Sequence, residues 1–387
     1  MGNGHSSPGA PNNDHQSHYY ARFGNEEMRG ELSSPFVQYE QKCNNKLLKM
    51  SFYGLWSIYQ PYGVTPTPRI GHFHSYDPDR ALVYVGYGCE EGGKLQNDVW
   101  ALETTTQKWH HIEVKGYHAT PRTGCSGVFW RGHILVYGGY TNEEYVGDLH
   151  AISCEDGSCE QIHTTGEVPP PRQYPILGVY ENRFYVWGGY NGTYPSDLYV
   201  LDLDTLVWKS YKENIQGRSS APYAVVGSHI YSYGGSKTAT MLHIDMTTNK
   251  VEEISGGGSP PQPDSVNAGM AATHDTIYWF GAIPNAEFGF VYAYDISRKW
   301  WFIFHVRPDG DTVGMADGRV DSFGLFQLPL IQYHTMQYES RTRTVLCVLG
   351  TPLKNPPPTV AVQLGDAIPA IHLRQDMLDA LPHVSES

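Results

Sequence analysis

Four arginines recur along the 387-residue chain, each sixteen or seventeen residues before a glycine, at Arg69, Arg122, Arg172 and Arg218. A guanidinium group is permanently charged and carries a planar fork of donors that matches a carboxylate, so this spacing predicts a binding surface. Tyrosines, which contribute strongly to binding energy at protein interfaces, lie in the same stretches. We predict that a partner contacts Arg69, Arg122, Arg172, Tyr174, Arg218, Tyr223, Tyr140 and Tyr190. The alternative is structural: the arginines bond backbone carbonyls that join neighbouring repeats.

The glycines that follow the arginines mark a repeat. Gly86, Gly138, Gly188, Gly234 and Gly281 are 52, 50, 46 and 47 residues apart, and Gly350 takes the same place in a sixth unit. A period near 50 residues is typical of repeat architectures. Residues 170–211 are the clearest copy, with short aromatic and β-branched segments between Gly, Pro and Asp. Each unit is therefore predicted to form four antiparallel strands, which makes the chain all-β.

The unit resembles the kelch repeat. Gly-Gly pairs end the second strand at 138–139, 188–189 and 234–235, and one position of the fourth strand carries Trp109, Trp208 and Trp301. The resemblance covers about residues 52–364. Departures from the family pattern occur at Gly86-Tyr87, Gly281-Ala282, Cys159 and Val251, and the last two units lack the opening arginine. The resemblance implies a β-propeller whose arginine-bearing and Gly-Gly loops emerge on one face, around a central channel.

The two ends of the repeat region complete one another. The last unit has three predicted strands and no tryptophan after them, whereas Trp56 stands thirteen residues before Arg69, the same interval as Trp109 to Arg122. The strand around Trp56 is therefore predicted to complete the last blade. We expect an all-β, six-bladed kelch β-propeller over residues 46–365, closed by the N-terminal strand, which leaves few exposed edges.

The regions outside the repeats are polar. Residues 1–45 are predicted to be a disordered tail, and residues 366–387 an extension with one short helix. The first six residues match the N-myristoylation pattern with Gly2 as acceptor, and an unmodified tail is the alternative. No apolar run spans a membrane, and neither a secretory signal nor a disulfide framework is recognisable among six cysteines. We expect a cytoplasmic protein, peripheral on membranes only if Gly2 carries a lipid.

Composition and spacing argue against nucleic-acid and metal chemistry. A net charge of −13 repels phosphate backbones. His150, Cys154, Cys159 and His163 have the types of zinc ligands, but four strand residues span roughly 13 Å, too far for one site without a sharp bend. The cysteine pair is expected to stay reduced, and no cofactor is predicted. A long insertion at 304–328, which includes Arg319, is expected either to cover the channel, adding Arg319 to the contact residues, or to be a solvated excursion.

The sequence therefore predicts a non-enzymatic protein-interaction module with no catalytic residues. The kelch resemblance implies a protein or peptide ligand, and a basic-lined face would favour an acidic segment or a free C-terminal carboxylate. Two alternatives remain open. One is a substrate receptor of a cullin-type ubiquitin ligase, with residues 373–381 docking an adaptor. The other is a kelch-propeller enzyme such as a sialic-acid epimerase, in which the arginines hold a carboxylate sugar.

Overall fold

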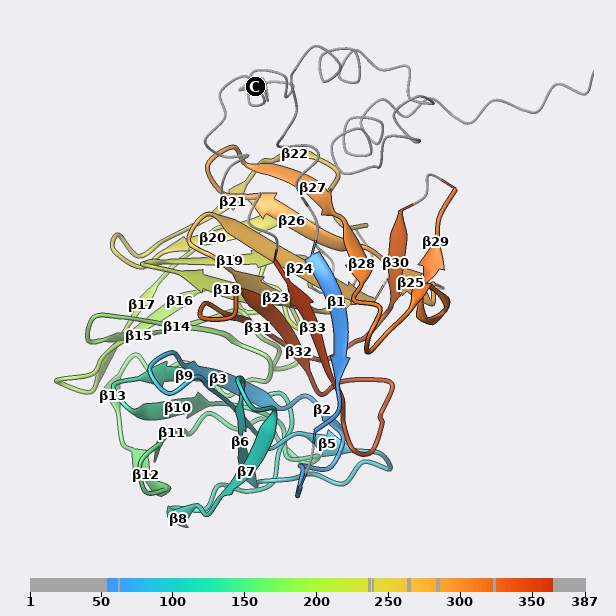
Figure 1. The fold of residues 1–387 in the computed structure, drawn as a ribbon. Helices are drawn as coiled ribbons and strands as arrows, with labels where there is room; N and C mark the ends of the chain where they lie inside the picture. The colour runs from blue at the N-terminus through green and yellow to red at the C-terminus, as the bar shows by residue number, and fades with distance from the viewer. Residues whose placement is uncertain are drawn as a thin grey trace, which may run out of the picture.

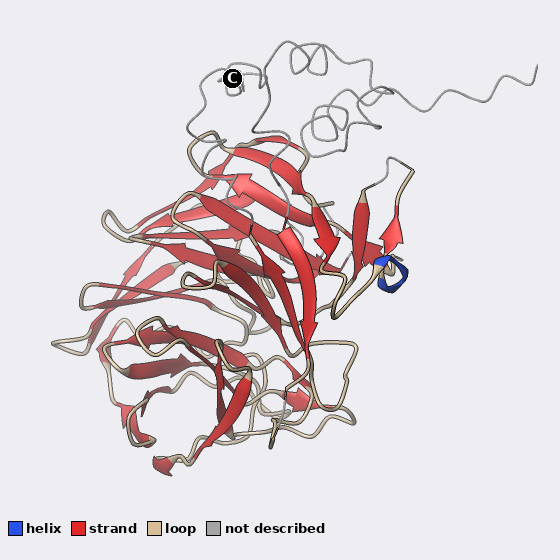
Figure 2. Ribbon diagram, viewed as in Figure 1, coloured by secondary structure: helices blue, strands red, loops and turns tan. Residues whose placement is uncertain are grey.

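The structure is a computed structural model that describes residues 54–364, except 62, 236, 237, 239, 263–265, 283–285, 323 and 324. The predicted tail with Gly2 and the predicted extension at 366–387 lie outside the described residues. The described residues are almost entirely strands and loops, with one short 3-10 helix, η1 (Met315–Asp317) (Figure 2). Within this part of the chain, no helix is long and apolar enough to cross a bilayer.

The first three repeats each form a sheet of four consecutive antiparallel strands, as the sequence predicts. The first sheet contains β3 (Phe73–Asp77), β4 (Leu82–Gly86), β6 (Val99–Glu103) and β7 (Lys108–Ile112). The second contains β9 (Ser126–Trp130), β10 (His133–Tyr137), β11 (Leu149–Ser153), β12 (Ser158–Ile162) and, parallel to β12, β8 (Lys115–Gly116). The third contains β14 (Ile176–Tyr180), β15 (Arg183–Trp187), β16 (Leu198–Asp202), β17 (Val207–Tyr211) and β13 (Thr165–Gly166).

The remaining repeats follow the same plan. The fourth sheet contains β18 (Tyr223–Val226), β19 (His229–Tyr233), β20 (Met241–Asp245) and β21 (Lys250–Ile254). The fifth contains β23 (Val266–Ala272), β24 (Thr276–Ala282), β26 (Val291–Asp295), β27 (Trp300–Phe304) and β22 (Gly257–Gly258). The next contains β31 (Thr335–Glu339), β32 (Thr344–Val348), β33 (Thr359–Gln363), β1 (Gly54–Tyr59) and β28 (Val306–Pro308).

A seventh sheet was not predicted. It joins β25 (Phe288–Gly289), β30 (Phe326–Pro329) and β29 (Arg319–Val320), and lies at the edge of the molecule in Figure 1. The described residues thus form seven sheets of three or more strands, and the predicted count of six is wrong by this one. Its strands lie outside the Gly-Trp period, so the repeat pattern carries no sign of them. A two-stranded sheet pairs β2 (Arg69–Ile70) with β5 (Cys89–Glu90).

Strand β1 pairs with strands from distant parts of the chain. It runs antiparallel to β33, with Trp56 opposite Val362, and parallel to β28 (Figure 1). The Trp56 side chain is 1% exposed and packs on Phe326 with ring centroids 5.6 Å apart. A Cβ atom added at Gly54 would lie 2.5 Å from Val362 Cγ1, so this close approach of the backbone requires glycine.

The strand registers confirm the predicted alignment of the fourth strands. Trp109, Cys159, Trp208, Val251 and Trp301 each lie opposite the fourth residue of the preceding strand. These side chains are buried, and with their neighbours they form apolar layers between adjacent sheets. Cysteine and valine therefore fill the same core position as tryptophan at lower volume. The hydrophobic core of the molecule is thus a succession of intersheet layers.

One detail of the predicted alignment is wrong. In the second repeat, Gly138 and Gly139 both have positive φ, 78° and 118°. The equivalent pair in the first repeat is Tyr87-Gly88, with φ of 63° and 92°, and not Gly86-Tyr87. The backbone N–H of Tyr87 donates to the Asp98 carbonyl, as that of Gly138 does to the Asp148 carbonyl. The first repeat has additional residues before β4, which displaced the alignment by one position.

We predict that replacing Trp56 with alanine lowers the free energy of unfolding by about 3–5 kcal/mol, because a fully buried aromatic side chain is removed from an intersheet layer. Urea denaturation followed by tryptophan fluorescence and circular dichroism measures the change. Leu55 is the matched control, since it is 41% exposed on the other face of β1. Its replacement with alanine is expected to change stability by no more than about 0.5 kcal/mol. Equal effects of the two substitutions would contradict the packing of β1.

Candidate functional site

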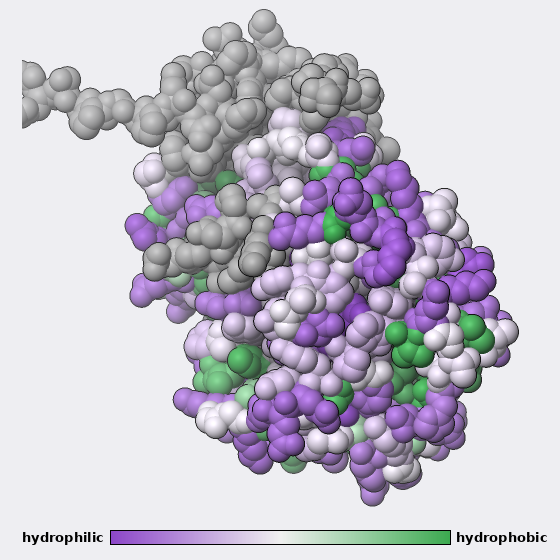
Figure 3. Space-filling model, turned by 180° about the vertical axis from the view of Figure 1, so that it is seen from behind, coloured by the Kyte–Doolittle hydropathy of each residue, from purple (hydrophilic) through white to green (hydrophobic). Residues whose placement is uncertain are grey.

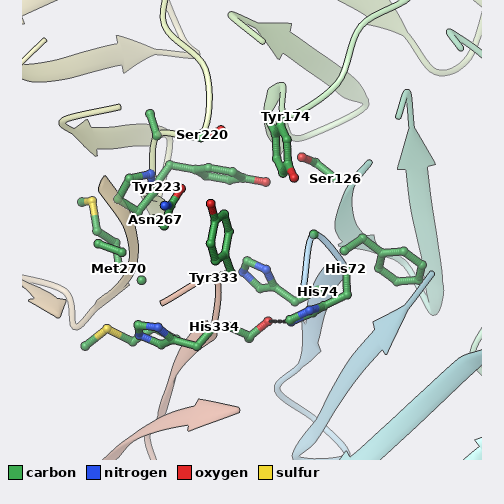
Figure 4. A pocket seen from close by; sticks show the side chains of 18 of the residues that line it. His72, His74, Ser126, Tyr174, Ser220, Tyr223, Asn267, Met270, Tyr333 and His334 are labelled. Atoms are coloured by element: carbon green, nitrogen blue, oxygen red, sulfur yellow. Dashed lines mark hydrogen bonds between the residues drawn. The ribbon is translucent and has the colours of Figure 1, made fainter. Parts of the chain in front are cut away.

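A cavity with both polar and apolar lining lies where the first strands of six repeats meet. Its lining comes from the starts of β3, β9, β18, β23 and β31, and from residues just before these strands and before β14. Its volume is about 120 Å³, enough for several water molecules or a small side chain. Figure 4 shows its main polar side chains: His72, His74, Ser126, Tyr174, Ser220, Tyr223, Asn267, Tyr333 and His334.

The mouth of the cavity is built on left-handed backbone. In or directly beside each of the six lining segments, one residue has φ between 51° and 70°: Gly71, Gly124, Tyr174, Ser220, Asn267 and Tyr333. Backbone hydrogen bonds join some neighbours, since the N–H of Gly124 donates to Gly71, that of Tyr174 to Gly124, and that of Tyr333 to Asn267. A non-glycine residue in this conformation costs about 1–3 kcal/mol, and such residues are found in turns and cluster at functional sites. Four such residues in one cavity therefore mark it as a candidate site.

The two glycines among these six positions make room for Tyr174. A Cβ atom added at Gly71 would lie 3.0 Å from the Tyr174 hydroxyl, and one added at Gly124 would lie 3.1 Å from its ring. The tyrosine ring therefore crosses the glycine positions of the first two repeats. Because Gly71 and Gly124 have no side chains, Tyr174 of the third repeat can occupy the space at this part of the mouth.

Three tyrosine rings gather around the cavity in Figure 4, from Tyr174, Tyr223 and Tyr333. Burial raises the pKa of Tyr223 to about 12 and also raises that of Tyr174. Tyr174 and Tyr223 are consequently protonated at neutral pH, and each phenol can both donate and accept a hydrogen bond. Ser126, from the second repeat, already donates its hydroxyl to the Pro175 carbonyl at 2.7 Å.

Three histidines form another part of the lining. Burial lowers the pKa of His334 and His72 to about 3 and that of His74 to about 4. These rings are therefore neutral at pH 7. The His72 Nε2 atom lies 2.9 Å from the Thr335 hydroxyl, the dashed contact in Figure 4. His334 is 6% exposed, and within the described part of the chain neither of its ring nitrogens has a hydrogen-bond partner.

The arginines do not line this cavity, and their burial gives no support to the prediction that they contact a partner. Arg69, Arg122, Arg172 and Arg218 are at most 2% exposed. The first two pair with the carboxylates of Asp98 and Asp148, and Arg218 Nη2 lies 2.9 Å from Glu253 Oε1. The guanidinium of Arg172 stands 5.1 Å from the ring centroid of Tyr199. These charges are neutralised or covered inside the sheets, so they present no basic face.

The structural alternative accounts for the arginines. Arg122 Nη1 donates to the Gly138 carbonyl at 3.3 Å and Arg172 Nη1 to the Gly188 carbonyl at 3.1 Å. Arg69 and Arg218 donate to the equivalent carbonyls of Tyr87 and Gly234. Each guanidinium thus ties the segment before the first strand to the left-handed pair after the second strand. Burial alone would raise the pKa of Asp148, but hydrogen bonds from His150 and Arg122 leave it well below its ordinary value.

A row of four tyrosines lies beside the mouth. The ring centroids of Tyr140 and Tyr145 are 5.2 Å apart, those of Tyr145 and Tyr190 5.9 Å, and those of Tyr190 and Tyr194 5.1 Å. The backbone of Tyr190 bonds that of Gln173, the residue before Tyr174. All four rings are half-buried. We call them the tyrosine row. The prediction missed Tyr145, although its place in the same loop as Tyr140 was a usable signal.

The other predicted candidates do not join the cavity. Arg319 is exposed in β29, and residues 304–328 contribute nothing to the described lining. The expected cover over the channel is therefore wrong: this segment instead forms β28 beside β1 and part of the seventh sheet. His150 is fully buried and bonds the Tyr87 hydroxyl at 2.8 Å, whereas His163 is exposed. Among the described residues, no three His, Cys, Asp or Glu side chains could hold a metal ion together.

Comparison with known proteins identifies relatives of this fold. The family model described as "KLHDC2/KLHL20/DRC7 Kelch-repeats domain" matches residues 37–235 and 179–313. Host cell factor 1 of Homo sapiens is 26% identical over 225 residues, covering 51% of this chain and 11% of that protein. Acyl-CoA-binding domain-containing protein 4 of Arabidopsis thaliana is 27% identical over 182 residues, covering 46% and 27%. The chain therefore spans about a tenth to a quarter of the length of these two relatives.

We predict that replacing Arg122 with alanine lowers the free energy of unfolding by about 3–5 kcal/mol, because the Asp148 carboxylate is left buried without its partner. Urea denaturation measures the loss. The exposed Arg319 is the control, and its replacement with alanine is expected to change stability by no more than about 0.5 kcal/mol. A stable Arg122→Ala protein would show that this guanidinium is not structural.

We also predict a loss of stability in mild acid that depends on His334. The unfolded histidine binds a proton below pH 6.5, but the folded one does so only near pH 3. Between these values the unfolded state holds more protons, so stability falls as the pH is lowered. From pH 7 to pH 5 the expected loss is about 2 kcal/mol for this residue. Urea melts at both pH values should show a smaller difference in His334→Phe, and an equal difference would contradict the burial of a neutral ring.

Proposed function

This chain belongs to the kelch-repeat family, whose propeller is a protein-interaction fold, and we propose that it binds a partner polypeptide over the mouth of its central cavity. The observation that carries the proposal is the gathering of tyrosine rings at and beside that mouth. The tyrosine row lies next to the cavity, and three further tyrosines line the cavity itself. Tyrosine supplies large contact area with little loss of side-chain freedom, and it is enriched at the energetic centres of protein interfaces.

The remaining visible surface does not compete with this site. On the face drawn in Figure 3, the described residues are mostly hydrophilic, and apolar residues form small separate patches. Scattered apolar residues are normal on a folded protein and need no partner. The concentration of aromatic side chains around one cavity is the more informative feature.

We propose further that six sheets form the ring and that the seventh is an outer attachment. The strands that line the cavity come from six repeats, and none comes from β25, β29 or β30. Trp56 lies opposite the fourth residue of β33, the register that the other fourth strands share. In this arrangement β1 supplies the outermost of four consecutive strands to the sheet of β31, β32 and β33. The ring is thereby closed by hydrogen bonds between the two ends of the chain.

The structure gives no support to the prediction that the ligand is acidic. Among the described residues, the cavity lining contains no Lys, Arg, Asp or Glu. The same finding removes support from the sialic-acid epimerase alternative, which required arginines at the channel. The ligase-receptor alternative relies on residues 373–381, which lie outside the described residues. A cytoplasmic location and membrane contact through Gly2 remain predictions from the sequence.

We predict that Tyr145→Ala and Tyr190→Ala each weaken partner binding at least about tenfold, because a buried interface tyrosine contributes about 2 kcal/mol. The measurement is affinity capture with the full chain, quantified by mass spectrometry, followed by titration of the captured protein. Tyr180→Ala is the matched control, since Tyr180 is also half-buried but lies at the opposite end of its sheet. Partner binding that survives both row substitutions, or is lost equally with Tyr180→Ala, would refute the proposed surface.

A further inference from the structure

The described lining of the central cavity carries no permanently ionised group, and this restricts what can enter it. Its polar groups are three phenols, three neutral imidazoles, two serines, one threonine, one thiol and one carboxamide, set among apolar side chains. The arginines nearest in sequence are turned into the sheets and paired there. A carboxylate, ammonium or guanidinium group entering this space would lose its hydration without gaining a counter-charge, which is costly.

The histidines strengthen the argument. A cavity that stabilised an anion would favour protonated imidazoles, yet burial keeps His72, His74 and His334 neutral far below pH 7. A neutral imidazole has one donor nitrogen and one acceptor nitrogen. Neither nitrogen of His334 has a partner within the described residues. A buried polar group without a partner is unfavourable, so a ligand group that pairs with either ring nitrogen, as donor or as acceptor, would be stabilised.

The other lining groups also need hydrogen-bond donors and acceptors from a ligand. The hydroxyls of Tyr174, Tyr223 and Tyr333 each donate one hydrogen bond and accept others, and the Asn267 side chain has two donors and one acceptor oxygen. These groups come from separate repeats and gather around one space in Figure 4. A hydroxyl ligand carries one donor hydrogen and accepts at the same oxygen atom. A primary carboxamide offers a carbonyl oxygen and two N–H donors within a group that is small enough for about 120 Å³.

We infer that the cavity binds an uncharged primary carboxamide, the side-chain group of asparagine or glutamine, presented by the partner polypeptide. The inference rests on the proposed function for the origin of the ligand, but the chemistry of the cavity is testable separately. The left-handed residues Tyr174, Ser220, Asn267 and Tyr333 hold the recognising side chains in place. The tyrosine row then contacts the flanking part of the partner outside the cavity.

Small probes test the chemistry directly. The full chain, labelled with nitrogen-15 at histidine, is titrated separately with acetamide, acetate and methylammonium while the imidazole resonances are followed by NMR. We expect acetamide to cause a saturable shift of the His334 ring, with a dissociation constant on the order of millimolar for so small a ligand. Acetate and methylammonium are expected to bind at least about tenfold more weakly. Acetate binding as tight as acetamide, or no saturable acetamide shift, would overturn the inference.

Two variants fix the location of binding. In His334→Phe, the remaining cavity histidines, His72 and His74, should no longer shift with acetamide, while a cooperative urea melt shows that the protein is folded. Asn267→Asp keeps the size of the side chain and the tolerance of asparagine and aspartate for left-handed backbone, but adds a negative charge. It should reverse the preference, so that methylammonium binds more tightly than acetamide. An unchanged preference in Asn267→Asp would place the binding elsewhere and overturn the inference.

The outcomes separate this inference from the proposed function. If acetamide fails to bind but partner capture still depends on Tyr145 and Tyr190, the inference falls and the interaction surface stands. If acetamide binds selectively in the wild-type chain and the variants respond as expected, the cavity chemistry is supported whatever the capture experiment shows. If Asn267→Asp also loses partner binding, and acetamide selectivity is confirmed, the carboxamide site takes part in partner binding.

Discussion

A buried guanidinium group bonded to a backbone carbonyl is the contact on which this surface depends. In four repeats the arginine before the first strand donates to the carbonyl at the start of the left-handed pair that ends the second strand. Two loops that are far apart in a repeat are thereby held together at one end of the sheet. Those two loops also carry the mouth of the cavity and the tyrosine row. The charged residue thus has a structural role, and the uncharged residues beside it form the mouth of the cavity and the tyrosine row.

This division explains which parts of the structure were predictable. Strand positions and the equivalence of Trp109 with Cys159 followed from a period that every repeat must keep, because each sheet packs on the next through the same position. The structural role of Arg122 could not be predicted from the sequence, because its spacing is the same whether the side chain contacts a partner or the Asp148 carboxylate. Sequence alone cannot separate these outcomes when the paired acid belongs to another strand of the same repeat.

The cavity could not be predicted from the sequence, for a different reason. Its six key positions are occupied by glycine, tyrosine, serine and asparagine, so they share a backbone conformation and no residue type. A search for recurring letters finds the arginine nearby and passes over the left-handed residue two places later. The seventh sheet could not be predicted from the repeat pattern either, because β29 and β30 belong to no repeat. Features that break a pattern or share only a torsion angle become visible in coordinates alone.

The four strained positions at the mouth differ in what a change to glycine would take away. At Ser220 or Asn267, glycine would relieve the unfavourable torsion and remove a small polar group. At Tyr174 or Tyr333 it would relieve the same torsion but remove an aromatic ring from the cavity lining. A shared backbone conformation therefore holds side chains of unequal weight in the stability of the fold.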